Sequence, residues 1–352
     1  MNLKKKQYNY FNYSILFVLT LINTTCLFDS IEQEDDSDVV QTTPPPKIGL
    51  QPGRIISDEN IYSNGDGTGN FRTHCEESHI SNDDPLVHPG QNGAAHQHVF
   101  FGFQKTNANT TIDMLENTTE PSTCEGIALN QSAYWVPALF SADGTRIKYK
   151  EVLFYYKSGY HIPGNVIQAP PKGLVMISGH DMSQPQDVVS AKYRCESWEA
   201  PLPQFDEGDP MDHIPYLPKC QIGDLLEFRV VFPQCWDGVN LTSKNNRSHM
   251  SYPIPAEVPF TGTGRCPDSH PIPIPEISYK FAIEVTKSTG LSDTWYLSSD
   301  MNELYPNGSS LHGDWMNGWD SEIMDLIIKN CINPGYDCGV GLLGDGTRLK
   351  EL

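Results

Sequence analysis

The chain has 352 residues, of which 38% are hydrophobic, so it is long enough and apolar enough to bury a large core. Its formal net charge of −20 excludes nucleic acid as a general partner, because a strongly acidic surface repels phosphate groups. The same surface disfavours anionic membranes and anionic polysaccharides unless a local basic cleft attracts them.

Residues 1–26 are typical of a secretory signal peptide. Lys4, Lys5 and Lys6 supply its positive region, and Ile15–Ile22 is a short apolar run. This run is too short for a bilayer, which needs about 20 residues, and no other stretch predicts a transmembrane helix. Cys26 lacks the aliphatic residue that a lipoprotein signal carries three positions earlier, so lipid anchoring is not expected. We therefore predict a secreted protein.

The body of the chain follows a polar linker. Residues 27–54 are acidic and then proline-rich (EQEDDSD, then TTPPPK), which predicts disorder because they cannot bury apolar area. Residues 55–340 contain no second linker and no internal repeat, and they predict a single β-rich domain. Residues 341–352 are left as a tail.

Strand patterns dominate this domain. Short apolar runs with alternation of period two predict strands over residues 98–103, 134–140, 152–157, 174–178, 225–232, 279–286 and 294–298. With 28 Gly and 27 Pro between them, they predict an all-β fold, an antiparallel β-sandwich or jelly roll with long loops. One C-terminal helix is predicted from Asp320, its N-cap, to Cys331. Its apolar face is formed by Ile323, Met324, Ile327 and Ile328.

The cysteine count predicts disulfides. Once the signal peptide is removed, eight cysteines remain: Cys75, Cys124, Cys195, Cys220, Cys235, Cys266, Cys331 and Cys338. An even number in an exported chain indicates four disulfides, and scattered spacing without CxxC disfavours a zinc site. Close spacing favours the pair Cys331–Cys338 first and Cys220–Cys235 second.

Five of the eleven histidines lie in polar, aromatic-rich motifs, where an imidazole would bind a metal or transfer protons. His96 and His98 are two residues apart in AAHQH, so on a strand both would point to one face. We predict them as metal ligands together with His270. Gly90 makes GQNGAAHQH similar to the opening of the cupin metal motif, although no Glu follows. The alternative is that both rings bind backbone groups at a sheet edge.

A second pair, His312 and Asp314 in LHGDW, would share one face of an extended segment. A carboxylate beside an imidazole orients it as a base or completes a metal shell. We predict both residues as catalytic, together with His249 and Asp237 from the polar segment 235–253. The alternative for that segment is a loop that satisfies its own hydrogen bonds.

The substrate-binding side chains are predicted from the same motifs. They are Trp236, Asn240, Arg247, Trp315 and Trp319. Tryptophan stacks on sugar rings, although core packing is the alternative for the last two. The adjacent acids of NDDP, Asp83 and Asp84, predict a turn closed by an Asx-type hydrogen bond and not a catalytic pair.

Long motifs in order carry a resemblance to a known family between about Arg72 and Cys331. They are FRTHCEESHISNDDPLVHPGQNGAAHQHVFFG, SAYWVPALF, YYKSGY, FPQCWDGVNLTSKNNRSHMSYP, CPDSHPIPIPEISYKF and HGDWMNGWD. Together they resemble the family catalogued as domain of unknown function nineteen-ninety-six, whose members are secreted proteins of fungi and bacteria, some attached to carbohydrate-binding modules. The resemblance implies secretion, one domain and a link to polysaccharide, and it assigns no role to any residue.

We therefore predict a secreted protein that acts on an extracellular glycan, a polysaccharide, through a histidine-rich site. That site would hold one divalent transition metal or work by acid/base catalysis. The alternative is a non-catalytic cell-wall or matrix carbohydrate-binding module, which the expected jelly roll and the loop aromatics favour. The enzyme hypothesis requires that the distant imidazoles meet in space.

Overall fold

The computed structural model describes residues 39–40, 49–63, 67–159, 161–180, 190–196, 213–255, 264–300 and 304–352. These belong to one unit, Asp38–Leu352. The predicted signal peptide and most of the predicted linker lie outside the described residues.

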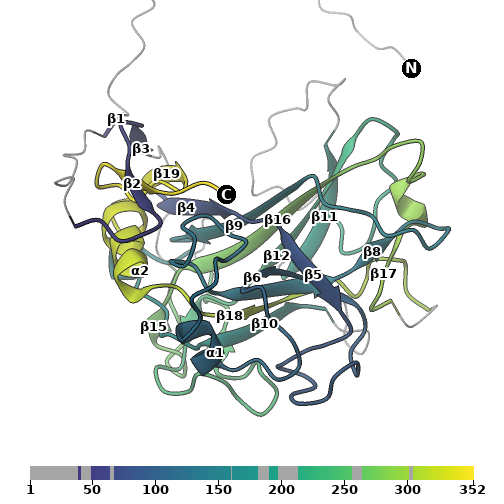
Figure 1. The fold of residues 1–352 in the computed structure, drawn as a ribbon, viewed down its shortest axis with the longest axis horizontal. Helices are drawn as coiled ribbons and strands as arrows, with labels where there is room; N and C mark the ends of the chain where they lie inside the picture. The colour runs from purple at the N-terminus through teal and green to yellow at the C-terminus, as the bar shows by residue number, and fades with distance from the viewer. Residues whose placement is uncertain are drawn as a thin grey trace, which may run out of the picture. The chain divides into compact units, whose positions relative to one another are not determined.

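Two β-sheets packed face to face form the body of this unit (Figure 1). The larger sheet has eight strands in the order β1 (Val39–Val40), β3 (Ile61–Ser63), β19 (Tyr336–Val340), β4 (Asn70–His74), β9 (Glu151–Lys157), β16 (Glu276–Glu284), β12 (Leu225–Val231) and β11 (Ala191–Glu196). The smaller has five, in the order β10 (Val175–Gly179), β18 (His312–Met316), β7 (Ala133–Pro137), β6 (His98–Gly102) and β5 (Glu77–Ser81). The pairings within both sheets are antiparallel except β19 with β4, which is parallel. The predicted all-β sandwich is confirmed.

Three small sheets accompany the sandwich. They comprise β14 (Met250–Ser251), β13 (Cys235–Trp236) and β15 (Ile272–Pro273), then β17 (Tyr296–Leu297) with β8 (Leu139–Phe140), and β2 (Arg54–Ile56) with β20 (Thr347–Leu349). The last strand lies in the segment left as a tail, and its pairing with β2 ties the two ends of the described chain together.

The alternating pattern places one face of each large strand in the core. On β12, Leu226, Phe228 and Val230 are buried between the sheets, whereas Glu227 and Arg229 lie on the opposite face. Burial of each large apolar side chain stabilises the fold by roughly 1.5–3 kcal/mol. The expected strands all overlap observed ones, because this alternation is strong in each of them.

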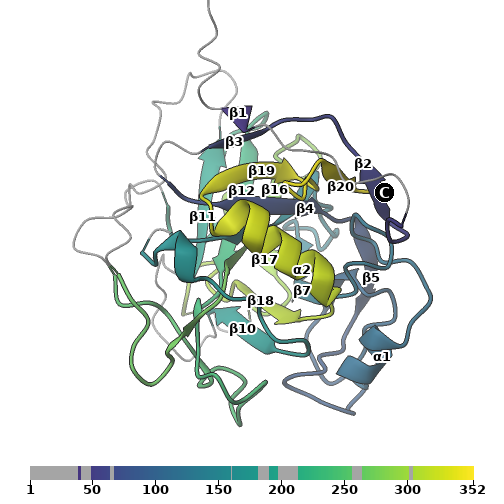
Figure 2. The ribbon, with the colours of Figure 1, turned by 90° about the vertical axis from the view of Figure 1, so that its left-hand side faces the viewer.

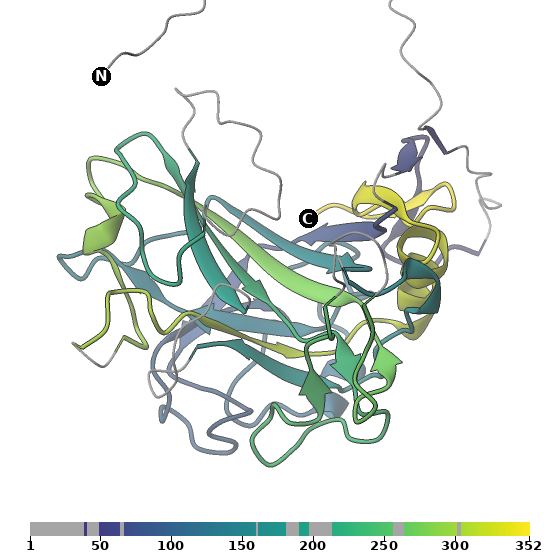
Figure 3. The ribbon, with the colours of Figure 1, turned by 180° about the vertical axis from the view of Figure 1, so that it is seen from behind.

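The five-stranded sheet buries side chains on both faces. Val99 and Phe101 of β6 point into the main core, and their neighbour Phe100 points to the outer face. There it packs with Trp135 and Met316 in a second apolar cluster. Loops cover this outer face (Figure 3). Side chains on the outer face of this sheet are therefore buried, as are those on its inner face.

The C-terminal helix agrees with its prediction. Helix α2 (Ser321–Ile327) continues into a π-helical turn, Ile328–Ile332, and lies across one end of the two sheets (Figure 2). Asp320 caps it by accepting hydrogen bonds from the backbone N–H groups of Glu322 and Ile323. The other described helices are α1 (Ile112–Glu116) and the 3₁₀ turns Gly164–Val166 and Ser292–Thr294. Among the described residues, no helix is long and apolar enough to cross a membrane.

Four disulfides are formed by the eight predicted cysteines. They are Cys75–Cys124, Cys195–Cys220, Cys235–Cys266 and Cys331–Cys338. The prediction for Cys331–Cys338 is confirmed, and the pairing of Cys220 with Cys235 is wrong. Closeness in sequence was a poor guide here. Cys195 lies near the end of β11 and pairs with Leu226 at the start of β12, so it is close to Cys220 in the segment that precedes β12.

Candidate functional site

Strand β18 carries two polar side chains to the outer face of the five-stranded sheet. His312 and Asp314 alternate with Gly313 and Trp315, which face the main core. A Cβ on Gly313 would lie 2.9 Å from the ring of Tyr279 on the opposite sheet, so glycine permits this close approach. The Tyr279 hydroxyl donates a 2.6 Å hydrogen bond to the Asp314 carbonyl oxygen and fixes the strand in place.

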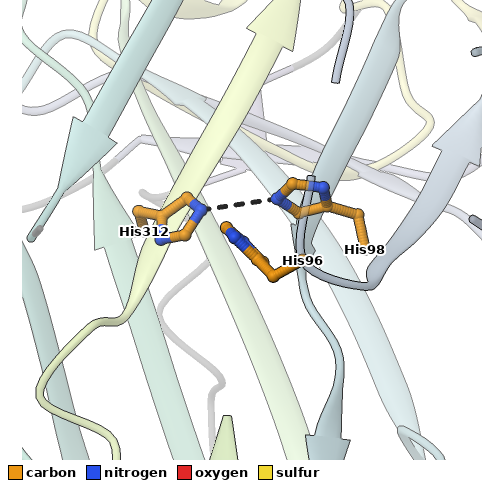
Figure 4. Close-up of side chains that lie close together, drawn as sticks. All are labelled: His96, His98 and His312. Atoms are coloured by element: carbon orange, nitrogen blue, oxygen red, sulfur yellow. Dashed lines mark hydrogen bonds between the residues drawn. The ribbon is translucent and has the colours of Figure 1, made fainter. Parts of the chain in front are cut away.

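Strand β6 and the loop before it bring two histidines to the same place. His98 lies opposite Pro137 of the central strand β7, and Asp314 lies opposite Trp135 of that strand from the other side. His96, His98 and His312 point toward one another (Figure 4). Ligand atoms of the three rings lie within 4.8 Å of one another. The structure thus brings together three of the predicted histidines from positions more than two hundred residues apart.

The hydrogen bonds of two of these rings fix where their protons lie. Nδ1 of His98 is 3.0 Å from the carbonyl oxygen of Asp83, and Nδ1 of His312 is 2.8 Å from that of Ser310. Because a carbonyl oxygen only accepts, Nδ1 carries the proton in each neutral ring. The two Nε2 atoms then carry lone pairs, and they face each other at 3.4 Å. Two facing lone pairs repel, so this arrangement requires a proton or a cation between them.

The separation of the two nitrogens suits a metal ion. Zinc–nitrogen bonds of about 2.0–2.1 Å in tetrahedral geometry place neighbouring nitrogens about 3.3–3.4 Å apart. Nε2 of His96 is buried and has no hydrogen-bond partner among the described residues. The backbone carbonyls that hold His98 and His312 occupy the place of the outer-shell groups that orient metal-bound imidazoles.

Two carboxyl groups lie beside the histidines. Ligand atoms of Asp84, His98 and Asp314 lie within 4.8 Å of one another. Asp84 Oδ1 accepts the backbone N–H groups of Leu86 and Val87, which is the predicted Asx-type turn, and Oδ2 accepts a 3.5 Å contact from the Trp135 indole. Asp314 is fully buried, and neither of its carboxyl oxygens has a hydrogen-bond partner in the described part of the chain. Asp314 Oδ2 lies 3.9 Å from Nε2 of His312. A buried carboxylate without hydrogen bonds is costly, and a bound cation would remove that cost.

Burial shifts the proton affinities of this group. Desolvation, followed by the charge of His88, lowers the pKa of His96 to about 4. Desolvation and then His96 and His312 lower the pKa of His98 well below its usual value. Desolvation, followed by the neighbouring Asp84, raises the pKa of Asp314 well above its usual value, although Arg247 opposes this. His96 and His98 are therefore neutral near pH 7, which is the form that binds metal.

An open cleft of about 420 Å³ leads to the site. Its walls come from the 84–88 turn, the 244–247 loop and the ends of β10 and β18. The lining side chains with polar or charged groups include Asp84, His88, His96, His180, Lys244, Arg247, His312 and Asp314. A substrate entering this cleft would meet the imidazoles of His96 and His312, and the buried ring of His98 contacts both of them.

Two predicted histidines are not brought into this cluster. His249 is buried with Nε2 2.7 Å from the Val175 carbonyl oxygen and Nδ1 3.0 Å from the Ser243 hydroxyl. His270, predicted as a metal ligand, has Nε2 3.1 Å from the Ser248 carbonyl oxygen and Nδ1 2.9 Å from the Ser269 hydroxyl. Both nitrogens of each ring are used locally. These rings connect loops and leave no lone pair for a metal.

The predicted polar loop largely satisfies its own hydrogen bonds. Asp237 accepts the backbone N–H groups of Val239 and Asn240 and the Asn240 side-chain amide. The Trp236 indole donates to the Asn240 carbonyl oxygen at 2.7 Å. These three residues were predicted as site residues, and none of them lines the cleft with the histidines. Arg247, from the same loop, does line it.

Two tryptophans predicted to bind substrate are core residues. Trp315 and Trp319 are 0% and 1% exposed. Trp315 faces the inter-sheet core because it alternates with Asp314 on β18, and the Trp319 indole donates to the Tyr156 hydroxyl. A sugar ring cannot reach either indole, so this prediction is corrected to core packing.

Some residues that line the cleft were not predicted from the sequence. Asp84 was predicted only as part of a turn, but its ligand atom also lies within 4.8 Å of those of His98 and Asp314. His88, His180 and Lys244 were not predicted. Only the HPG sequence after the NDDP turn hinted at His88, and no local pattern distinguishes His180 or Lys244.

Comparison with known proteins identifies a family and nothing more specific. No curated protein and no solved structure matches the chain. A family model described as domain of unknown function (DUF1996) matches residues 84–319, which is more than half of the chain. The match begins at Asp84 and includes the three clustered histidines and Asp314. The chain belongs to the DUF1996 family.

Proposed function

We propose that this protein is a secreted, metal-dependent enzyme that acts on extracellular polysaccharide. One divalent transition-metal ion, with zinc as the first candidate, would be held by His96, His98 and His312. The observation that carries the proposal is the pair of Nε2 atoms facing each other at 3.4 Å, each in a ring whose Nδ1 is held by a backbone carbonyl.

The two carboxyl groups would divide the remaining work. A divalent cation in such a site polarises a substrate oxygen or lowers the pKa of bound water. Asp314, which is buried and lacks hydrogen bonds in the described chain, would complete the metal shell. Asp84, whose Oδ1 accepts hydrogen bonds from two backbone N–H groups, would accept or return a proton at the substrate.

The glycan as substrate is supported by the setting of the site. The cleft is open and carries charged and imidazole side chains that can hydrogen-bond to hydroxyl groups, and four disulfides suit an oxidising compartment. The alternative binding module loses two of its candidate aromatic side chains, because Trp315 and Trp319 are buried and offer no stacking surface.

Metal analysis tests the metal centre. Protein purified without chelators should carry about one equivalent of transition metal, since three histidines with an open position form a high-affinity site. His98→Ala and His312→Ala should each lose most of it, whereas the control His270→Ala should retain it, because His270 lies in a loop contact. Less than about a tenth of an equivalent in the wild type, or equal loss in the control, would reject the metal centre.

Turnover tests the enzyme. The metal-loaded protein should release soluble products from members of a polysaccharide panel, chelation should abolish release, and re-addition of metal should restore it. Saturable binding to a glycan without products, unchanged in His98→Ala and His312→Ala, would instead support the binding module.

A further inference from the structure

The cleft contains a cationic wall on a molecule that is otherwise strongly acidic. Lys244 and Arg247 line it, opposite the turn that carries Asp84. The chain has a formal net charge of −20, so two basic side chains lining one cleft make this region more positive than the average of the chain. If a divalent cation were bound to the histidines, the positive charges in the cleft would outnumber the negative charges of Asp84 and Asp314.

The loop that carries these cations is built to hold them in place. Asn245 Oδ1 accepts hydrogen bonds from the backbone N–H groups of Arg247 and Ser248. Asn246 has a φ of 52°, in the left-handed region that asparagine tolerates better than most residues. Its side-chain amide donates to the Leu86 carbonyl oxygen at 2.7 Å and ties this loop to the opposite wall of the cleft.

Arg247 itself is anchored but retains donors. Its Nη1 donates to the Ile177 carbonyl oxygen at 3.2 Å, which fixes the guanidinium beside the end of β10. Within the described ranges this is its only side-chain hydrogen bond, and no carboxylate there forms an ion pair with it. A guanidinium has five N–H donors arranged as a planar fork that matches a carboxylate.

We propose that the polysaccharide of this enzyme is anionic and that Arg247, assisted by Lys244, binds the carboxylate of a uronic acid residue next to the metal. This inference rests on the proposed function, and it specifies the substrate class of the same site. The net negative charge of the chain disfavours the approach of anionic polysaccharides in general, and the local cationic wall attracts them at this cleft. A uronate would place one carboxylate oxygen pair on the Arg247 fork while its ring oxygens lie toward the histidines.

Calorimetric titration of the zinc-loaded protein tests the proposal. Short oligogalacturonate should bind, and the neutral oligogalactose of equal length should bind about 10- to 100-fold more weakly, the range that charge-assisted hydrogen bonds produce. Arg247→Gln should abolish most of this preference and Arg247→Lys should recover part of it. The matched control is Arg265→Gln, because Arg265 is an exposed arginine outside the cleft.

Three outcomes would overturn the proposal. They are equal affinity for the charged and neutral oligosaccharides, equal losses in Arg247→Gln and Arg265→Gln, and binding of inorganic phosphate without binding of oligogalacturonate. Zinc content measured on the same samples distinguishes failure of the proposed substrate class from failure of the proposed metal-dependent function. Protein that retains zinc but shows no preference for the uronate contradicts the substrate class alone, whereas protein without zinc contradicts the proposed function.

Discussion

Single imidazoles differ in this protein by whether one or both ring nitrogens have a local partner. His249 and His270 use both nitrogens on neighbouring hydroxyl and carbonyl groups. His98 and His312 use one nitrogen on a carbonyl and direct the other toward each other. The second arrangement leaves donor atoms for a ligand, and this distinguishes a metal site from loop packing.

Zinc should therefore stabilise the fold through these rings. Adding zinc at about 1,000 times its dissociation constant should raise the free energy of unfolding by about 4 kcal/mol, because the ion binds only the folded arrangement. His98→Ala should remove this response, and His270→Ala should keep it. Thermal unfolding with and without zinc measures the effect, and an equal zinc response in wild type and His98→Ala would contradict the assignment.

For single residues, the sequence predicts which side chains are candidates for the site better than it predicts what each of them does. The period of a strand places His312 and Asp314 of β18 on one face, so their pairing was predictable. His96 lies in the loop before β6, so its closeness to His98 depends on that loop and not on strand period. Whether a ring nitrogen finds a carbonyl in its own loop depends on tertiary contacts such as Val175 with His249. Alternation along β18 places Trp315 on the face opposite His312 and Asp314. The sequence did not show which of these two faces packs against the main core, so the burial of Trp315 there was not predicted.

A buried carboxylate on β12 forms ion pairs with basic side chains from three strands. Glu227, with a fully buried side chain, forms ion pairs with Arg194 of β11, Arg229 of its own strand and Lys280 of β16. Burial alone would raise its pKa, but Arg229, Lys280 and Arg194 outweigh that effect and lower the pKa to about 2. The carboxylate therefore favours the folded state in its charged form.

The pH dependence follows from that direction. A pKa below the ordinary 4.5 means that the stabilisation is complete above pH 4.5 and is lost as the pH falls toward 2. Glu227→Gln should lower the free energy of unfolding by roughly 3 kcal/mol at pH 7, and the deficit should shrink below pH 4. Urea unfolding across this range measures it. Glu284→Gln, which removes an exposed partner of Lys150, serves as the control and should change little.

The disulfide at the base of the cleft loop should contribute more than the one beside α2. Cys235–Cys266 closes a separation of 31 residues and Cys331–Cys338 one of 7. Loop-closure entropy predicts losses of about 3.7 and 2.4 kcal/mol when each pair is replaced by serine. Urea unfolding of the two double variants tests the order. A larger loss for the short loop would show that native contacts, and not chain entropy, determine it.

Elements with a strong pattern were predicted and weakly patterned ones were not. The alternation in β12 and β16 and the capping residue Asp320 identified two core strands and the helix. Strands β4, β5 and β11 mix polar and apolar residues, since one face of each contacts polar groups and charged pairs. Their pattern alone did not predict them.

The order of strands in the whole unit lies beyond local patterns. Strand β19, close to the C-terminus, inserts between β3 and β4 and pairs with β4 in parallel. Likewise β18 inserts between β10 and β7 and so brings His312 beside His98. These insertions join segments far apart in the chain, and the metal-site geometry results from them. The sequence predicted a sandwich, but this order required the three-dimensional structure.

Cysteine accounting over the whole chain gives a test of export. The chain has nine cysteines, eight are paired, and Cys26 is the remaining one. If the first 26 residues are removed on secretion, protein from the culture medium, denatured without reductant, should contain no free thiol. Protein that retains the segment should contain about one thiol per chain. Thiol titration with mass measurement of the intact chain distinguishes these cases. A full-length mass with a free Cys26 thiol on protein from the medium would contradict signal cleavage, because the predicted signal peptide comprises residues 1–26.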